Sequence, residues 1–216
     1  IATGSEATSL KNIEFDEKVI VSSTGALELK KIPEKMIIVG AGVIGLEMGS
    51  IYSRLGTEVT VLEFFDKVLN GMDHDISKNF KSILQKQGFK FHLNSSVSMI
   101  TKEKKGVKVT FKQVDSHDQN ELSADVVLVA TGRKPFTKNL KLENIGVKLN
   151  PKGQIETDSK WRTTATNIFA IGDVTSGPML AHKAEEEGIA VAEIVAGQAG
   201  HVNFQVIPSV VYTDPE

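Results

Sequence analysis

The stretch Lys35-Met36-Ile37-Ile38-Val39-Gly40-Ala41-Gly42-Val43-Ile44-Gly45 decides the fold of this chain. Its apolar, β-branched first half predicts a strand ending in the pattern G-x-G-x-x-G, and apolar residues at helical spacing continue to Leu55. Gly56 predicts the end of that helix, and the apolar run that follows ends in Glu63. The predicted order is a strand, a tight turn, a helix and a second strand that ends in an acidic residue about 20 positions beyond the glycines. This order is typical of a dinucleotide-binding site.

The three glycines and Glu63 each have a physical role in such a site. Gly40 permits the tight turn, Gly42 lets the backbone approach a pyrophosphate, and Gly45 lets helix and strand pack closely. The helix N-terminus offers N–H groups and the positive end of its dipole to phosphates, while the carboxylate of Glu63 can accept both hydroxyls of the adenosine ribose. The alternative is a glycine-rich turn that binds nothing. With 18 glycines in the chain the bare pattern is weak, so it is the flanking elements that favour a site.

The residues after the second strand distinguish between the two nicotinamide cofactors. A site for NADP places a basic residue where the 2′-phosphate lies, but Glu63 is followed here by Phe64, Phe65 and Asp66. Because a carboxylate repels a phosphate, the sequence predicts NAD. The nearest basic residue is Lys67.

The composition is that of an ordinary globular protein. Hydrophobic residues make up 40% of the 216 positions, charged residues make up 24%, and the net charge is −2. This balance gives no electrostatic case for nucleic acid or an anionic membrane as a partner, and no apolar run approaches the ~20 residues of a membrane-spanning helix. The absence of cysteine excludes disulfides and thiolate ligands within the chain, and the five histidines lack metal-ligand spacing, so no metal site is expected.

Strand and helix patterns alternate along the first two thirds of the chain, with an antiparallel insertion. The expected strands are 36–39, 58–63, 89–93 and 125–131, all parallel, with an antiparallel meander over 97–114. The polar run 115–120 predicts a hairpin turn or loop. A helix is expected over about 75–87. Its core-facing residues are Ile76, Phe80, Ile83 and Leu84.

A second set of motifs indicates a second, incomplete nucleotide-binding fold. Residues 1–4 and 129–132 both consist of an apolar strand end followed by Ala/Thr and a glycine. The apolar run 168–171 predicts a buried strand that ends in Gly172 and Asp173, at the sheet edge where α/β folds bind ligands. Alternatively, Asp173 caps the turn that follows it. A last helix is expected over about 181–196, with a small apolar inner face: Ala184, Ile189, Ala192, Ile194 and Val195.

The two ends of the sequence both have the pattern of interrupted strands. The sequence opens on Ile1-Ala2-Thr3-Gly4, which has the pattern of the tail of a strand, and closes on an apolar run broken off at Asp214-Pro215-Glu216. We therefore expect an internal piece of a longer protein.

Taken together, the motifs resemble those of the flavin-dependent pyridine nucleotide–disulfide oxidoreductases. The matching motifs, in order, are Ala2-Thr3-Gly4, Gly40-x-Gly42-x-x-Gly45, Glu63, Ala130-Thr131-Gly132-Arg133 and Gly172-Asp173. Within the family the sequence is most similar to the members that oxidise dihydrolipoamide, in the runs 40–47, 75–93, 177–188 and 207–216. Relatives such as glutathione reductase typically carry alanine at the position of Gly45 and basic residues after the second strand. The resemblance covers essentially the whole chain.

The resemblance implies an α/β fold with a doubly wound, Rossmann-like NAD domain, a small antiparallel meander and part of a second, FAD-binding Rossmann-like domain. The implied bounds are 1–33 for the end of the first FAD segment and a linker, 34–150 for the NAD domain, 151–206 for the second FAD segment and 207–216 for the start of a dimerisation domain.

The resemblance also assigns cofactor-binding residues. Those implied for NAD are Gly40, Ala41, Gly42, Val43, Ile44, Gly45, Leu46, Glu47, Glu63, Val97 and Gly132. Those implied for FAD are Thr3, Gly4, Ser5, Asp173, Met179, Leu180, Ala181 and His182. Val97 matches the wall beside the adenine. Glu47 matches a glutamate near the nicotinamide that pairs with a lysine of the FAD domain in relatives; the alternative is a solvent-facing helix residue.

The activity implied is oxidation of dihydrolipoamide through a redox disulfide and FAD, with hydride transfer to NAD. The family's cysteine pair lies upstream of these residues and its His–Glu acid–base pair downstream, so no catalytic residue is expected here. The implied partners are a lipoyl domain that carries the substrate, the other components of a 2-oxo acid dehydrogenase complex and a second copy of the parent protein. The implied location is the mitochondrial matrix in a eukaryote and the cytoplasm in a bacterium.

Two alternatives to this activity stay open. One is another flavoprotein of the same family, such as a mercuric reductase or a soluble transhydrogenase-type enzyme. The other is a nucleotide-binding or interaction module without catalysis. We also expect these 216 residues alone to bind FAD weakly, because the resemblance places the adenine and pyrophosphate cradle for FAD before Ile1.

Overall fold

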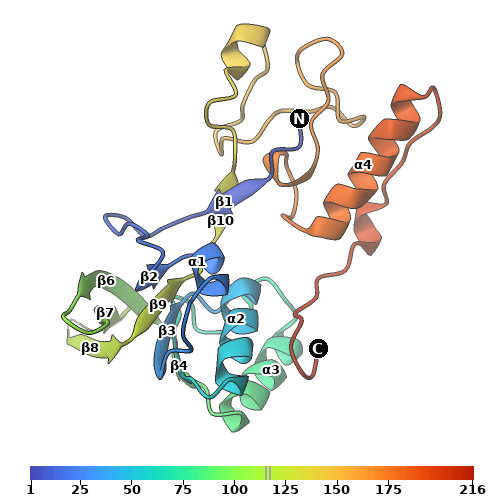
Figure 1. Cartoon of the computed structure of the whole chain (residues 1–216). Coiled ribbons are helices and arrows are strands. Elements are labelled where there is room, and N and C mark those ends of the chain that lie inside the picture. The colour runs from blue at the N-terminus through green and yellow to red at the C-terminus, as the bar shows by residue number, and fades with distance from the viewer. Residues whose placement is uncertain (115, 117) are drawn as a thin grey trace. The chain divides into compact units, whose positions relative to one another are not determined.

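The computed structural model describes residues 1–114, 116 and 118–216, and these form two compact units (Figure 1). Unit 1 comprises Ile1–Glu6 and Arg133–Pro208, and unit 2 comprises Ala7–Gly132 and Ser209–Glu216. The mixed α/β fold class, with a parallel sheet and antiparallel strands, is confirmed.

The bounds of the units differ from the expected domain bounds because of strand pairing. Residues 7–33 belong to unit 2, since β2 (Ile20–Val21) pairs with β9 (Val126–Val129). Residues 133–150 belong to unit 1, where β10 (Arg133–Pro135) pairs with β1 (Ser5–Ala7).

A five-stranded parallel sheet forms the centre of unit 2 and confirms the expected parallel strands. Its order is β2, β9, β3 (Lys35–Val39), β4 (Glu58–Leu62) and β5 (Lys90–His92). Val39 is level with both Leu62 and Val129. Because of this register, β3, β4 and β9 end side by side at one edge of the sheet.

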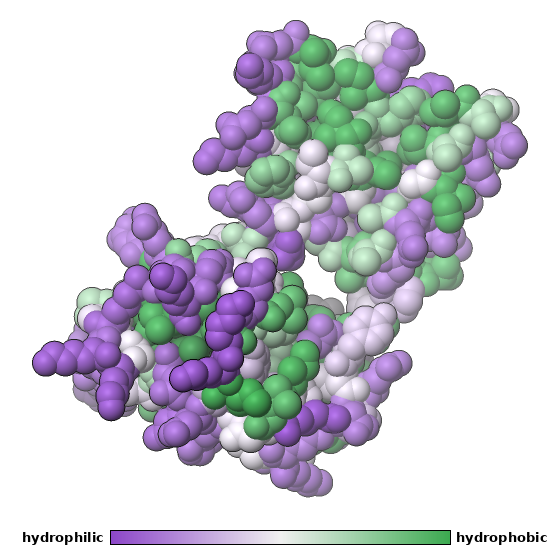
Figure 2. Space-filling view, in the orientation of Figure 1, coloured by the Kyte–Doolittle hydropathy of each residue, from purple (hydrophilic) through white to green (hydrophobic). Residues whose placement is uncertain are grey.

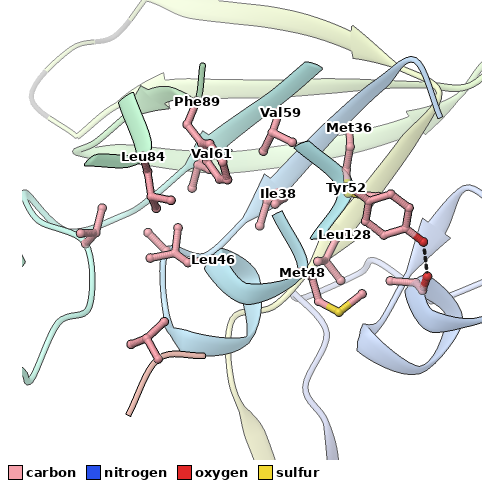
Figure 3. Close-up of a cluster of buried hydrophobic side chains, with 14 of the residues drawn as sticks. Met36, Ile38, Leu46, Met48, Tyr52, Val59, Val61, Leu84, Phe89 and Leu128 are labelled. Atoms are coloured by element: carbon pink, nitrogen blue, oxygen red, sulfur yellow. Dashed lines mark hydrogen bonds between the residues drawn. The ribbon is translucent and has the colours of Figure 1, made fainter. Parts of the chain in front are cut away.

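Three helices cover one face of this sheet. They are α1 (Ser23–Leu27), α2 (Val43–Arg54) and α3 (His74–Lys86). Side chains alternate along β3, so that Met36 and Ile38 pack toward the helices while Ile37 packs on the opposite face. Figure 3 shows the helix-side cluster, in which the hydroxyl of Tyr52 donates a hydrogen bond to the carbonyl of Ala26.

An antiparallel meander, β6 (Ser95–Lys102), β7 (Val107–Gln113) and β8 (Gln119–Ala124), covers the opposite face of the sheet. The expectation of a meander over 97–114 is correct in type but too short, because it lacks β8. That strand is mostly exposed and carries the weak pattern QNELSA, so its pairing with β7 is what makes it a strand. Of the expected turn at 115–120, Asp115 and His117 lie outside the described residues.

Helix α3 begins close to its expected position, and of its expected core-facing residues Phe80 and Leu84 are buried and Ile83 is partly buried. Asp73 caps it by accepting hydrogen bonds from two backbone N–H groups, and the hydroxyl of Ser77 donates to the carbonyl of Val68 at 2.5 Å. Ser77, Phe80 and Leu84 are consequently buried. The expectation that Ile76 faces the core is wrong: it is 56% exposed.

Unit 1 contains little regular structure besides its short β1–β10 ladder. It holds two 3₁₀ turns, η1 (Leu142–Ile145) and η2 (Gly172–Val174), then α4 (Ala181–Val195) and a third turn, η3 (Phe204–Val206). The strand expected at 168–171 is not formed. The segment makes one isolated bridge, between Phe169 and Arg162, and two backbone hydrogen bonds with Ile1. A ladder this short does not make a strand.

The inner face of α4 is only in part the expected one: Ile194 packs against the cluster around Ala190, but other expected residues are exposed. The buried residues of this helix are Lys183, Glu187 and Ala190, whereas Ile189 is 57% exposed and Val195 is exposed as well. The apolar face expected from the sequence therefore points partly to the surface. Figure 2 shows hydrophobic residues across the visible face of unit 1. Within the part of the chain that the structure describes, no helix is long and apolar enough to cross a membrane.

The two faces of α3 give a direct test of this packing. Replacing Leu84, which is fully buried, with alanine should lower the free energy of unfolding by about 2–5 kcal/mol, because the substitution leaves a cavity. Ile76→Ala on the exposed face should change it by only about 0.5 kcal/mol. Urea unfolding followed by circular dichroism measures both variants. Equal losses in the two would contradict the helix orientation described here.

Candidate functional site

The glycine turn lies where the carboxyl ends of β3, β4 and β9 meet. Gly40 has a φ of +107°, its N–H donates to the carbonyl of Leu62 at 2.9 Å, and a Cβ there would lie 2.5 Å from the carbonyl oxygen of Ala130. A Cβ at Gly45 would lie 2.3 Å from the carbonyl oxygen of Gly40. Only glycine fits either position, so the turn is tight and α2 packs closely on the sheet.

The start of α2 is open to a ligand. Gly42 is its N-cap residue and has no side chain to occupy the first N–H groups of the helix. A Cβ at Gly42 would meet no described atom within 4 Å. The backbone can therefore be approached closely here, at the positive end of the helix dipole.

The carboxylate of Glu63 bonds to the glycine turn. It follows β4 directly and is 8% exposed. One of its oxygens accepts a hydrogen bond from the N–H of Ala41 at 2.5 Å, and the other accepts from the N–H of Phe65 at 2.9 Å. Hydrogen bonds to an ionised group are stronger than neutral ones, so Glu63 fixes the shape of the turn as well as offering a negative charge.

A cavity of about 470 Å³ opens between these elements. It is bounded by the ends of the three parallel strands and by the start of β6, which is the edge at which open α/β sheets bind ligands. The predicted NAD residues that line it are Gly40, Ala41, Gly42, Glu63, Val97 and Gly132.

The other predicted NAD residues lie behind the cavity wall. Val43 and Ile44 pack against the helix-side core, Gly45 contacts the turn, and Leu46 is fully buried. Glu47 does not point freely to solvent: its carboxylate accepts a hydrogen bond at 2.8 Å from the N–H of Tyr212 in the C-terminal segment of unit 2.

Several residues that line the cavity were not singled out from the sequence as site residues. They are Leu10, Val39, Leu62, Phe64, Phe65, Asn70, Ser95, Ser96, Ala130 and Thr131. Those at the ends of strands could have been found by counting outward from the predicted strand ends. Leu10 belongs to an irregular segment, and its sequence carried no signal.

In unit 1, three residues far apart in sequence form one polar cluster. The hydroxyl of Ser5 in β1 donates to the carboxylate of Asp173 in η2 at 2.5 Å. Arg133 in β10 donates to the hydroxyl and to the carbonyl of Ser5, both at 2.7 Å. The hydroxyl of Thr3 donates to the carbonyl of Phe136 at 2.7 Å, which holds the start of β1 on the same ladder. Ser5 and Asp173, both predicted for FAD, are thus brought together.

The remaining residues predicted for FAD lie at the start of α4. Leu180 is the N-cap residue and makes no side-chain capping bond. His182 contacts the last residue of unit 1: its Nε2 lies 2.9 Å from the carbonyl oxygen of Pro208. Met179 and Leu180 are partly buried and Ala181 is exposed. The region therefore combines a helix N-terminus, which favours negative charge, with an apolar surface.

Comparison with known proteins places the chain in one family. The sequence pattern of the pyridine nucleotide-disulphide oxidoreductases matches residues 1–188. The mitochondrial dihydrolipoyl dehydrogenases of Homo sapiens and Rattus norvegicus are each 53% identical over 218 aligned residues, which cover 100% of this chain. The chain spans 43% of the length of these curated relatives.

Two solved structures share the fold. RclA from Escherichia coli, an HOCl-induced flavoprotein disulfide reductase, superposes with a TM-score of 0.88 at 32% identity over 99% of this chain and 49% of its own. LpdA from Mycobacterium tuberculosis superposes with a TM-score of 0.89 at 28% identity, over 99% of this chain and 46% of its own. With its glycine turn, acidic strand end and paired sequence motifs, the chain belongs to the pyridine nucleotide-disulphide oxidoreductase family.

Proposed function

We propose that these residues form the NAD-binding part and a portion of the FAD-binding part of an NAD-dependent dihydrolipoyl dehydrogenase. The observation that carries the proposal is the position of Glu63, a buried carboxylate bonded to the glycine turn inside a cavity at the carboxyl edge of the sheet. The identity to dihydrolipoyl dehydrogenases over the whole chain supports this activity over others in the family. Unit 2 then corresponds to the NAD domain and unit 1 to the FAD portion.

The cavity of unit 2 fits a dinucleotide. The open backbone at Gly42 and the first N–H groups of α2 would bind the pyrophosphate, and the carboxylate of Glu63 would accept the hydroxyls of the adenosine ribose. Val97 and Phe65 line the same cavity and offer apolar contact for the adenine. The remaining residues of the proposed NAD set act by holding the turn: Val43, Ile44, Gly45, Leu46 and Glu47.

The cavity favours NAD over NADP because of its charge. The carboxylate of Glu63 is fixed by two backbone N–H groups, so it cannot swing away from a 2′-phosphate without losing both bonds. Phe64 and Phe65 beside it offer no positive charge to such a phosphate. NADP would therefore bring a phosphate against a buried negative charge.

The cluster in unit 1 fits part of a flavin nucleotide. Asp173 presents a carboxylate whose second oxygen can accept from a ribityl or ribose hydroxyl, while Ser5 holds the first. The backbone of Thr3 and Gly4, directly before Ser5, would lie beside the same part of the flavin nucleotide. The start of α4, from Met179 to His182, offers a helix dipole that would stabilise negative charge on a reduced flavin. When bound, FAD and NAD supply the electron and hydride transfer of the reaction, and these residues position them.

The other parts of the proposed activity involve residues and molecules outside this chain. We place the redox disulfide and the His–Glu acid–base pair in other segments of the full-length protein, since this chain contains no cysteine. The proposed partners are dihydrolipoamide on a lipoyl domain, the other components of a 2-oxo acid dehydrogenase complex and a second copy of the protein. Because the curated relatives are mitochondrial proteins, the proposed location is the mitochondrial matrix.

The role of Glu63 in cofactor choice can be measured directly. The double variant Glu63→Ser with Phe64→Arg should weaken NAD binding by about tenfold or more, because ribose recognition and the bond to Ala41 are both lost. It should also shift the NAD/NADP preference toward NADP, because the repulsion is removed and a phosphate partner is added. Titration of both cofactors by calorimetry measures the change.

A matched control separates this effect from general electrostatics. Asp66→Ser removes one negative charge from the same exposed loop without touching the turn, and it should leave the preference for NAD unchanged. An unchanged NAD/NADP ratio in the Glu63 double variant would refute the proposed contact with the ribose.

The activity itself is tested on the full-length protein. It should be yellow, retain FAD through gel filtration, and reduce NAD with dihydrolipoamide far faster than it reduces NADP. Reduction of glutathione disulfide or mercuric ion in place of dihydrolipoamide oxidation would favour another member of the family. A colourless protein that binds NAD would indicate a nucleotide-binding module without catalysis.

A further inference from the structure

Helix α4 carries a fully buried ion pair that the proposed cofactor contacts do not involve. Lys183 and Glu187, one turn apart, are 0% and 2% exposed, and their charged groups are 3.1 Å apart. Removing two charges from water is costly, and their attraction offsets that cost only when further hydrogen bonds satisfy both groups. The partners that satisfy them show what the pair holds in place.

Among the described residues, the further hydrogen-bond partners of the pair lie in the turn that carries Asp173 and directly after it, within residues 172–176. The second carboxylate oxygen of Glu187 accepts a hydrogen bond from the N–H of Gly172 at 2.7 Å. The ammonium of Lys183 donates to the carbonyl of Gly172 at 3.2 Å, to the hydroxyl of Thr175 at 3.4 Å and to the carbonyl of Ser176 at 3.2 Å. The pair therefore binds both polar groups of the residue before Asp173 and the end of the same turn.

Two segments hold the turn that carries Asp173: α4, through the ion pair, and Ile155, whose N–H donates to the carbonyl of Val174 at 2.8 Å. Gly172 is buried with a φ of +74°, and a Cβ there would lie 3.2 Å from the Cβ of Ala184 on α4. The side chain of Asp173 is fixed by Ser5; the backbone before it is held by the bonds of the pair to Gly172, and the backbone after it by the bond from Ile155 to Val174. Apolar side chains at 183 and 187 could fill the same space, but they would supply none of these bonds.

We infer that Lys183 and Glu187 are positioning residues for the carboxylate of Asp173, and that they tune flavin affinity through the backbone of the turn. The inference rests on the proposed function, in which Asp173 binds FAD. It assigns to the pair a role beyond stability, because a well-packed apolar replacement would keep the fold and lose the geometry of the turn.

The test uses the full-length protein stripped of FAD and measures two quantities for each variant: the Kd for FAD by flavin fluorescence and the Tm of the apoprotein. The double variant Lys183→Met with Glu187→Leu should keep a Tm close to that of the wild type and raise the Kd for FAD by about tenfold or more. Glu186→Gln, an exposed neighbour on the same helix, is the matched control and should change neither quantity.

Coupling to Asp173 distinguishes positioning from general stability. Asp173→Asn should raise the Kd on its own, and adding the Met/Leu pair to it should raise it little further, because both changes remove the same contact. Fully additive effects, or a double variant with wild-type FAD affinity, would overturn the inference alone. Wild-type FAD affinity in Asp173→Asn would refute the proposed role of Asp173 and the inference with it.

A milder variant keeps the test decisive if the double variant does not fold. Thr175→Val preserves the ion pair but removes the hydroxyl that donates to the carbonyl of Gly172 at 2.8 Å and accepts from Lys183. It should raise the Kd for FAD by about fivefold with the Tm nearly unchanged. An unchanged Kd in this variant would contradict the role of the turn.

Discussion

The hydrogen bond from the N–H of Ala41 to the carboxylate of Glu63 connects the end of β4 to the glycine turn after β3. It forms only because the two strands end level, with Val39 opposite Leu62, and because Gly40 adopts a backbone conformation that other residues avoid. The register depends in turn on the core, since a shift by one residue would turn every apolar side chain to the wrong face. The packing of the core thus sets the register of the sheet, and the register sets the shape of the turn and of the site.

Unit 1 fixes the carboxylate of Asp173 by a different means. Glu63 follows a regular strand and is held by neighbouring backbone, whereas Asp173 lies in a short 3₁₀ turn with few regular contacts. A buried ion pair on α4 supports that turn, together with a backbone hydrogen bond from Ile155 to Val174. Both arrangements satisfy the requirement that a binding group be held by a second layer of bonded residues.

What the sequence predicted correctly was local or strongly periodic. The glycine turn, four of the five parallel strands and the approximate bounds of α2 and α3 follow from spacing alone, and the cavity-lining residues at the turn follow from them. What it missed depends on partners distant in sequence: β8 is a strand because it pairs with β7, and residues 168–171 lack the neighbours that would extend their ladder. The burial of Lys183 and Glu187 could not be read from a charged sequence, because each is satisfied by a turn that precedes the helix.

The central claim is that the glycine turn and Glu63 form a dinucleotide site. Hydrogen–deuterium exchange of this chain with and without NAD tests it most directly, because the method reports the backbone amides that the ligand is expected to contact. The account predicts slower exchange with NAD in residues 40–46 and around 63–65 and 95–97, and no change in residues 133–208. Protection confined to 133–208, or none at a NAD concentration that saturates the relatives, would contradict it.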